Sequence, residues 1–168
     1  MRKVTKIGDV FSIKIDETYK KYIQYIANDL TQLNSDVVRA FTKKYSIHEN
    51  PSLDEIINDN VDFYAHCVLK FGVKLNLWEN VGSNQNIGSF ENILFRDTLD
   101  YGHKVGENPI RNSNNWHIWK INDEKFTNVK KITEQIRKAD IGLIFNPLGI
   151  VELLRNNKYP VNYPEFEM

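Results

Sequence analysis

The sequence predicts a single α+β domain, with a mostly antiparallel sheet that could close into a barrel and two or three short helices. Three observations lead to this fold class. Apolar and polar residues alternate strictly from Phe11 to Ile15, and several later segments are rich in aromatic and β-branched residues. Helix-start patterns occur at Ser52 and at Asn146-Pro147.

Three strands are predicted in the first third of the chain. The alternation extends over Lys6–Asp16, after a Gly-Asp turn, and is typical of a strand with one buried face. Tyr22–Leu30 is rich in aromatic and β-branched residues and predicts a second strand, paired with the first across the polar turn Thr18–Lys21. Asp36–Tyr45 fits helical spacing equally well, but its β-branched residues favour a strand.

A short helix and another strand follow. Ser52 and the glutamate three residues after it form a capping-box pattern, which predicts a helix that ends near Asn58–Asn60. The alternation over Val61–Lys70 predicts a strand. After a break at Gly72, we expect extended chain through Lys74–Trp78.

The second half predicts shorter elements separated by loops. Strands are expected over Ile93–Thr98, Trp116–Asn122 and Ile141–Phe145, and the second of these should be central because both its faces are bulky. Asp100–Asn115 contains glycine, proline and asparagine and predicts a long loop. Pro147–Asn157 predicts a helix, because proline suits the first helical turn.

The end of the chain is expected to be irregular but docked. Lys130–Ala139 is basic and polar, and either a helix or irregular structure is compatible with it. The tail, residues 158–168, contains two prolines, while Tyr159, Tyr163 and Phe166 can attach it to the body. No repeat or linker divides the chain, so residues 1–168 are predicted to form one domain.

Composition limits the class of protein. Lys plus Arg and Asp plus Glu both number 22, and a net charge of zero argues against a general nucleic-acid binder. The single cysteine, Cys67, excludes an intramolecular disulfide. No apolar run approaches the roughly 18 residues of a membrane span, so we expect a cytoplasmic, soluble protein without a membrane partner.

No motif predicts a metal site, a cofactor or a catalytic group. The histidines form no HxH or HxxxH pair, and Cys67 shares a strand face with core-type residues. His117 and Trp119 share one face of a predicted strand, where they could form an aromatic pocket with a base. A histidine simply packed beside a tryptophan is the favoured interpretation. The four histidines are His48, His66, His103 and His117.

One charge feature is uncommon. No Lys or Arg occurs between Tyr45 and Leu69, although five acidic residues fall there. An acidic patch of this kind could attract a basic partner, and a solvated helix face is the alternative. The five acidic residues are Glu49, Asp54, Glu55, Asp59 and Asp62.

The start of the chain resembles a known family. Lys6–Ile13 is similar to the GDxF-type start of the immunity protein 26 family of bacterial polymorphic toxin systems, and the aromatic-led strand Tyr22–Asn28 follows as it does there. Further similar places are Gly72–Gly82 with its central Trp78, Trp116–Asn122, Gly142–Pro147, Tyr159-Pro160 and Tyr163-Pro164. These short, structural motifs are scattered over most of the chain.

The resemblance implies a protein without catalytic activity that binds a cognate toxin domain and blocks it by steric and charge complementarity. The family supplies no fixed set of binding residues. From the sequence we expect the interface at Asp54, Glu55, Asp59 and Asp62, with Trp78 as a possible anchor or else a core residue.

Two other functions stay open. A small hydrolase or nuclease would use His117, His66 and a carboxylate. A ligand-binding module would have a large apolar cavity beside Trp119. An immunity protein would instead have a filled core and an exposed, charged face.

Overall fold

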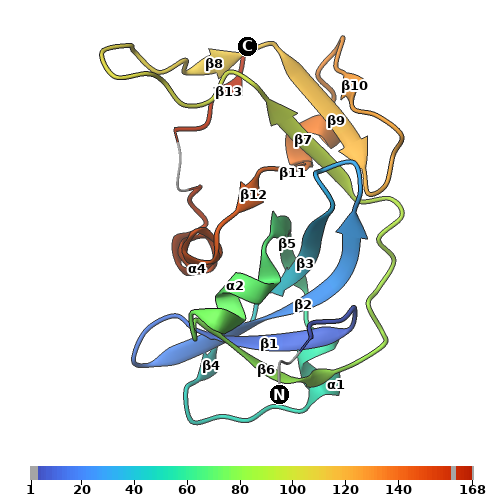
Figure 1. Cartoon of the computed structure of the whole chain (residues 1–168), viewed down its shortest axis with the longest axis vertical. Helices are drawn as coiled ribbons and strands as arrows, with labels where there is room; N and C mark the ends of the chain where they lie inside the picture. Colours follow the sequence, from blue (N-terminus) through green and yellow to red (C-terminus); the bar gives the residue numbers. More distant parts are fainter. Residues whose placement is uncertain (1–3, 160–161, 168) are drawn as a thin grey trace.

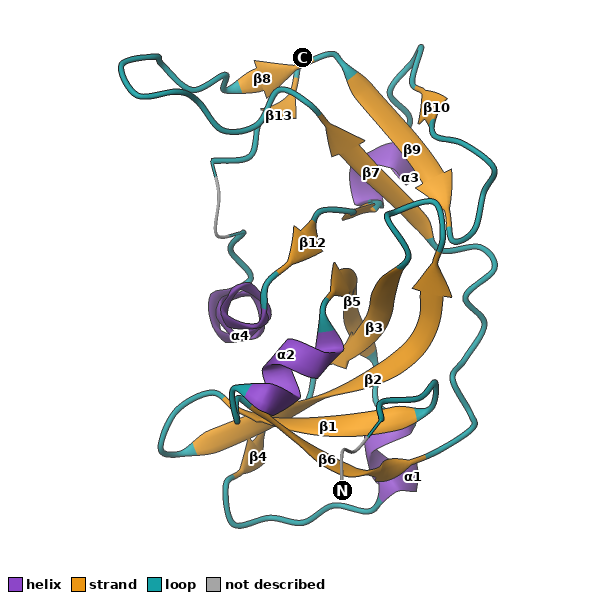
Figure 2. Cartoon of the chain, viewed as in Figure 1, coloured by secondary structure: helices purple, strands orange, loops and turns teal. Residues whose placement is uncertain are grey.

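The computed structural model describes residues 4–159 and 162–167 of the chain. Four helices and thirteen strands occur in this part, and most strand pairs are antiparallel (Figures 1 and 2). The predicted α+β fold is therefore confirmed. The largest sheet has the order β12-β5-β3-β2-β1-β6, which ends in two different strands. It is open, so the barrel-like alternative is wrong.

The elements form three sheets with helices beside them. The first sheet contains β1 (Asp9–Lys14), β2 (Tyr19–Asp29), β3 (Ser35–Phe41), β4 (Tyr45–Ser46), β5 (Val61–Cys67), β6 (Trp78–Ser83) and β12 (Ile144–Phe145). The second contains β7 (Leu94–Thr98), β9 (Trp116–Lys120), β10 (Thr127–Asn128) and β11 (Asp140–Ile141), and the third pairs β8 (Asn112–Ser113) with β13 (Glu165–Phe166). The helices are α1 (Leu53–Ile57), α2 (Leu69–Lys74), α3 (Glu134–Lys138) and α4 (Pro147–Asn156).

The Gly-Asp turn at the start of β1 has a packing role. Gly8 has φ +98°, a conformation that side chains disfavour, and a Cβ there would lie 2.8 Å from Gln85 Nε2. The Gly8 amide donates to Tyr25 O at 2.8 Å, while its carbonyl accepts from the Asn84 amide at 2.9 Å. The turn thus joins the β1–β2 hairpin to the segment after β6, and glycine is required by this close approach.

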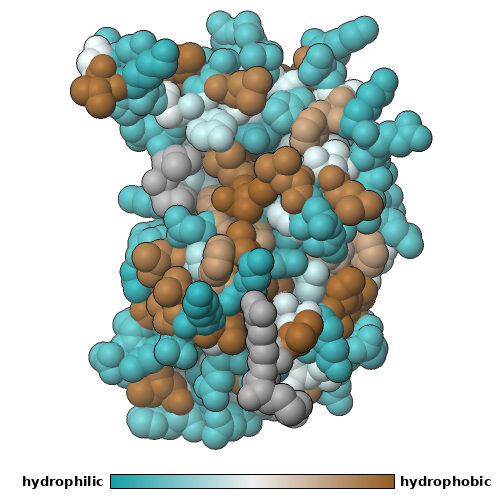
Figure 3. Space-filling view, viewed as in Figure 1, coloured by the Kyte–Doolittle hydropathy of each residue, from teal (hydrophilic) through white to brown (hydrophobic). Residues whose placement is uncertain are grey.

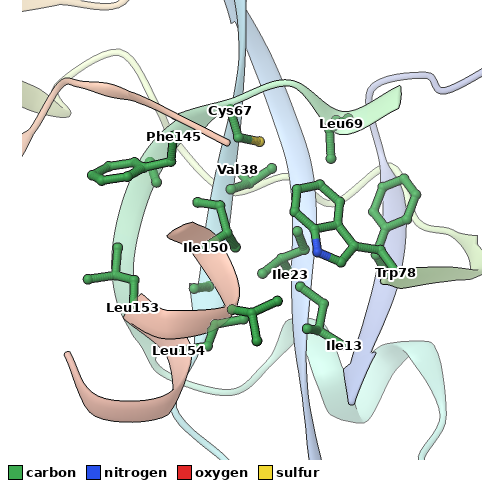
Figure 4. Close-up of a cluster of buried hydrophobic side chains, with 14 of the residues drawn as sticks. Ile13, Ile23, Val38, Cys67, Leu69, Trp78, Phe145, Ile150, Leu153 and Leu154 are labelled. Atoms are coloured by element: carbon green, nitrogen blue, oxygen red, sulfur yellow. The ribbon is translucent and has the colours of Figure 1, made fainter. Parts of the chain in front are cut away.

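The main hydrophobic core lies on one face of the first sheet. Inward residues of β1, β2, β3 and β5 pack against α2, α4 and the Trp78 indole (Figure 4). The α4 side chains Ile150 and Leu154 point towards Trp78, and Leu153 lies on the side of the helix near Phe145. Helix α4 begins as the sequence predicts, because the Asn146 side chain accepts from the Gly149 amide and Pro147 occupies the first turn.

A smaller core lies beneath α1 on the opposite face. Ile56 and Ile57 pack there with four buried residues of the sheet and its edge: Val10, Tyr22, Phe41 and Tyr45. The predicted cap is confirmed, because Ser52 Oγ accepts from the Glu55 amide at 3.1 Å. The helix ends at Ile57, slightly before the expected Asn58–Asn60.

A third cluster joins the two larger sheets. Phe95 of β7 and Trp119 of β9 pack against Ile26, Ala27 and Val37 of the first sheet. Strand β9 lies between β10 and β7, which confirms its predicted central position. Asp36–Tyr45 forms a strand over most of its length, as its β-branched residues favour.

Two predicted elements are wrong. Residues around Gly72 form helix α2 where a strand end and extended chain were expected. Gly72 is a packing contact and not a chain break, because it backs onto the Trp78 ring with no room for a Cβ. The expected strand Ile141–Phe145 is divided: β11 pairs with β7 in the second sheet and β12 pairs with β5 in the first. The chain passes between the sheets at Gly142, where Trp119 occupies the Cβ position.

The tail is docked where the structure describes it. Tyr159 stacks near Phe145 with ring centroids 5.6 Å apart, and Tyr163 donates to Asp97 Oδ1 at 2.7 Å. Contrary to the expectation of a fully irregular tail, Glu165–Phe166 forms β13, which pairs in parallel with β8. Residues 160, 161 and 168 of the predicted tail lie outside the described part.

The basic segment before β11 forms α3, which resolves the choice between helix and irregular structure. Thr133 caps α3, since its side chain accepts from the Ile136 amide at 3.3 Å. None of the helices in residues 4–159 and 162–167 has the length and apolar character needed to cross a membrane.

Gly142→Ala should destabilise the fold by roughly 1–3 kcal/mol, because the added methyl group overlaps the six-membered part of the Trp119 indole. Urea unfolding of the variant and the wild type measures the loss. In a Trp119→Phe background, Gly142→Ala should lower the free energy of unfolding by a smaller amount, since the overlapping ring atoms are gone. An equal loss in both backgrounds would contradict this account.

Candidate functional site

Three predicted interface carboxylates lie close together at α1. We call Asp54, Glu55 and Asp59 the acidic face. Asp54 accepts from Asn84 Nδ2 at 3.0 Å, and Glu55 forms an ion pair with Lys43 at 2.6 Å. Asp59 accepts from the Lys43 amide at 2.7 Å and from Thr42 Oγ1 at 3.0 Å. Each carboxylate therefore has a defined orientation at the surface.

Lys43, which precedes the predicted acidic segment in the sequence, contacts the acidic face. The hydrogen bond from Lys43 lowers the pKa of Glu55, and the same contact raises the pKa of Lys43. Both side chains are about half exposed, so the pair adds little to stability. The face consequently carries mixed charge with an acidic excess.

Two other predicted interface residues lie elsewhere. Asp62 is paired with the buried Lys21 at 3.0 Å and is itself mostly covered. Trp78 is 3% exposed and packs with Phe11 in the main core. Of the two alternatives for Trp78, surface anchor or core residue, the structure has the core residue, because the indole is enclosed by α2 and the sheet.

The predicted aromatic pair His117 and Trp119 is brought together on β9. Their rings stack with centroids 5.7 Å apart, and Phe126 packs edge-on against both. Burial lowers the pKa of His117, against the opposing effect of Asp97 on the neighbouring strand. Phe95 and Gly142 contact the indole as well, so side chains and backbone fill the space around Trp119.

His66 lies in a fully buried polar cluster that the sequence did not reveal. We call it the Asp29 cluster. His66 Nε2 lies 2.8 Å from Asp29 Oδ2, and the same oxygen accepts from Trp119 Nε1 at 2.9 Å. Asp29 Oδ1 accepts from the amides of Asn122 and Thr31 at 2.9 and 3.0 Å. Both His66 and Asp29 have side chains that are 0% exposed, so no solvent-borne substrate reaches this histidine.

Electrostatics in the Asp29 cluster favour the ionised carboxylate. Burial alone would raise the pKa of Asp29, but hydrogen bonds from His66, the Asn122 amide and Trp119 outweigh it and hold the pKa below the ordinary value of 3.8. The carboxylate is thus a structural anion, fully occupied by donors.

Asp140, at the start of β11, shows the opposite shift. Burial raises its pKa to about 6, although the Tyr64 amide and the positive charge of Arg96 act against the shift. Asp140 Oδ2 accepts from the Tyr64 amide at 3.0 Å, which connects β11 to β5.

A second buried polar group lies on the first sheet. Arg39 Nε donates to Gln24 Oε1 at 2.8 Å, and Arg39 Nη2 donates to Asn86 O at 2.7 Å. Gln24 Nε2 in turn donates to Asn84 O at 2.8 Å. These bonds hold the segment after β6 against the sheet. Polar residues within the otherwise apolar strands were the only sequence signal for this group.

The remaining chemistry-bearing residues are dispersed. Cys67 is buried in the main core, as predicted, and burial raises its thiol pKa. Within residues 4–159 and 162–167, no group of three or more His, Cys, Asp or Glu side chains is placed to hold a metal ion.

Comparisons with protein-family models, with curated proteins and with solved structures find no match to this chain.

Asp29→Asn should lower the free energy of unfolding at neutral pH by roughly 2–4 kcal/mol. In either orientation of the amide, its NH₂ group faces donors, either the Trp119 indole or the two backbone amides. The difference in unfolding free energy between the variant and the wild type should narrow as the pH falls below about 3.8. The lowered folded-state pKa of Asp29 stabilises the wild type fully only above the ordinary value, and this stabilisation is lost as the carboxylate is protonated. Chemical unfolding at several pH values measures it.

Asp36→Asn is the control for this test. The Asp36 carboxylate accepts a backbone hydrogen bond from Leu69 at 3.1 Å and lies beside the Tyr25 hydroxyl, and an amide oxygen can accept from either donor. Equal losses in the two variants would contradict the role assigned to the Asp29 cluster.

Asp140→Asn should stabilise the protein above pH 6 by up to about 2 kcal/mol, because it removes a buried charge while an amide oxygen still accepts from Tyr64. The folded-state pKa is raised, so the wild type regains stability as the pH falls from about 6 towards 3.8, and the gain should vanish there. Urea unfolding at pH 7.5 and 4.5 tests this. A pH-independent difference would contradict it, and Glu124→Gln controls for the change in net charge.

Proposed function

We propose that the chain is an immunity-type protein that binds a cognate toxin domain in the cytoplasm and blocks it. The observation that carries the proposal is the acidic face, in which Asp54, Glu55 and Asp59 are held at the surface by bonds within the chain. Carboxylates that are already oriented lose little side-chain entropy on binding. They are suited to a partner with a basic surface.

The surroundings of this face support a rigid binding surface. Helix α1 is fixed by Ile56 and Ile57 in the smaller core, and Leu53 packs against Gly82 of β6. Binding would then need little rearrangement of the backbone. The resemblance of Lys6–Ile13 to the immunity protein 26 family is the reason for proposing a toxin domain as the partner of this surface.

The histidine chemistry required by a hydrolase has less support. His66 is buried and bound to Asp29, while His117 is packed against Trp119 and Phe126. An aromatic ligand pocket beside Trp119 would require these side chains to move. Protein binding at the exposed carboxylates requires no such change.

Asp54→Lys/Glu55→Lys should weaken binding to the toxin domain by roughly 10- to 100-fold and reduce the association rate, most strongly at low salt. Tagged protein captures the partner from lysate of the native cells, mass spectrometry identifies it, and purified components give the rates and the inhibition of toxin activity. Asp59 is left intact because it holds the backbone after β3.

The matched control is Glu124→Lys/Glu167→Lys, which makes the same change in net charge with exposed residues far from α1 in sequence. It should leave affinity and inhibition nearly unchanged. Equal weakening by the two double variants would move the interface away from α1. Recovery of a small molecule or metal in place of a toxin domain would overturn the proposed function.

A further inference from the structure

A cavity of about 460 Å³ lies beside the second sheet, and we call it the arginine cavity. Arg96 of β7, Arg137 of α3 and Ile141 of β11 form part of its wall. Hydrophobic side chains gather on the surface in the region of β11 and β12 (Figure 3). The aromatic part of the wall comes from the C-terminal segment: Tyr159, Tyr163 and Phe166.

Aromatic rings hold both guanidinium groups in place. Arg96 lies over the rings of Trp116 and Phe166, with its Cζ atom 5.0 and 4.7 Å from the two centroids. Arg137 lies over the same Phe166 ring at 5.2 Å. The Nε atom of Arg96 also donates to Ala139 O at 2.9 Å. Stacked guanidinium groups are preorganised, so less entropy is lost for each hydrogen bond they form.

The donors of these groups are not used by carboxylates in the described part of the chain. Within residues 4–159 and 162–167, neither Arg96 nor Arg137 has an ion pair, and Arg96 forms no hydrogen bond through its terminal nitrogens. The nearby Asp97 accepts from the Tyr163 hydroxyl and the Thr98 amide. Asp140 accepts from the Tyr64 amide, as described above.

Acidic groups near the cavity oppose an incoming anion to different degrees. Burial raises the pKa of Asp97 and raises that of Asp140 to about 6, so the Asp140 carboxyl stays mostly ionised at neutral pH and loses its opposing charge only below about pH 6. Glu165 also lines the cavity, but its side chain is exposed to solvent, where its charge is screened.

We propose that the arginine cavity binds a single oxyanion, either a carboxylate or a phosphate group, through Arg96 and Arg137. The planar donor fork of arginine matches the paired oxygens of both groups. The rings of Tyr159 and Tyr163 would contact the apolar part of the molecule that carries the anion. A small metabolite and an acidic side chain of a protein share this chemistry. The site is separate from the acidic face and does not depend on the proposed toxin binding.

The test titrates the full chain with two probes at constant ionic strength, inorganic phosphate and N-acetylglutamate N-methylamide. NMR signals of the arginine Nε–Hε groups report on Arg96 and Arg137 directly. We expect saturable shifts of both signals with millimolar affinity. Arg137→Gln should weaken binding roughly tenfold, the usual effect of losing a hydrogen bond to a charged group.

Lys138→Gln is the matched control, because Lys138 is the neighbouring exposed cation on α3 and does not line the cavity. It should change the affinity less than twofold. Tighter binding of phosphate would indicate a phosphorylated small molecule, while tighter binding of the glutamate probe would indicate a carboxylate ligand. The proposal is overturned if neither probe shifts the arginine signals up to roughly 50 mM, or if Lys138→Gln weakens binding as much as Arg137→Gln.

Discussion

The Asp29 carboxylate is the interaction on which the arrangement of the two large sheets depends. It ends β2 and accepts hydrogen bonds from His66 of β5, from Trp119 of β9 and from two backbone amides. A buried charge is expensive unless its hydrogen-bonding capacity is filled, so these four donors are confined to hydrogen-bonding geometry. Through β9 the same constraint positions β7, and with it Arg96.

Much of the fold could be predicted because it depends on local patterns. The β1–β2 hairpin follows from alternation, while α1 and α4 follow from their capping residues. The errors occur where distant side chains decide the backbone. Helix α2 packs on Trp78 through Gly72, and the chain between β11 and β12 packs on Trp119 through Gly142. Neither contact leaves a periodic signal in the sequence.

The candidate sites show the same limit. The sequence correctly placed Asp54, Glu55 and Asp59 near one short helix, because they are close along the chain. It did not show that Lys43 joins them across the surface or that Trp78 is enclosed in the core. Arg96 and Arg137 lie in different elements far apart in the sequence, β7 and α3. Both stack on the ring of Phe166, so no local motif could have connected them.

The charge balance at the acidic face determines how a partner would be recognised there. Three carboxylates against the one ammonium group of Lys43 leave an excess of two negative charges. At physiological ionic strength the field of such a group is screened over about 8 Å, so long-range attraction is modest. Recognition would therefore depend mainly on the fixed directions of the carboxylates at short range. Those directions are set by Asn84, Lys43 and Thr42, which come from segments on both sides of α1, so the specificity of this surface is a product of the tertiary fold.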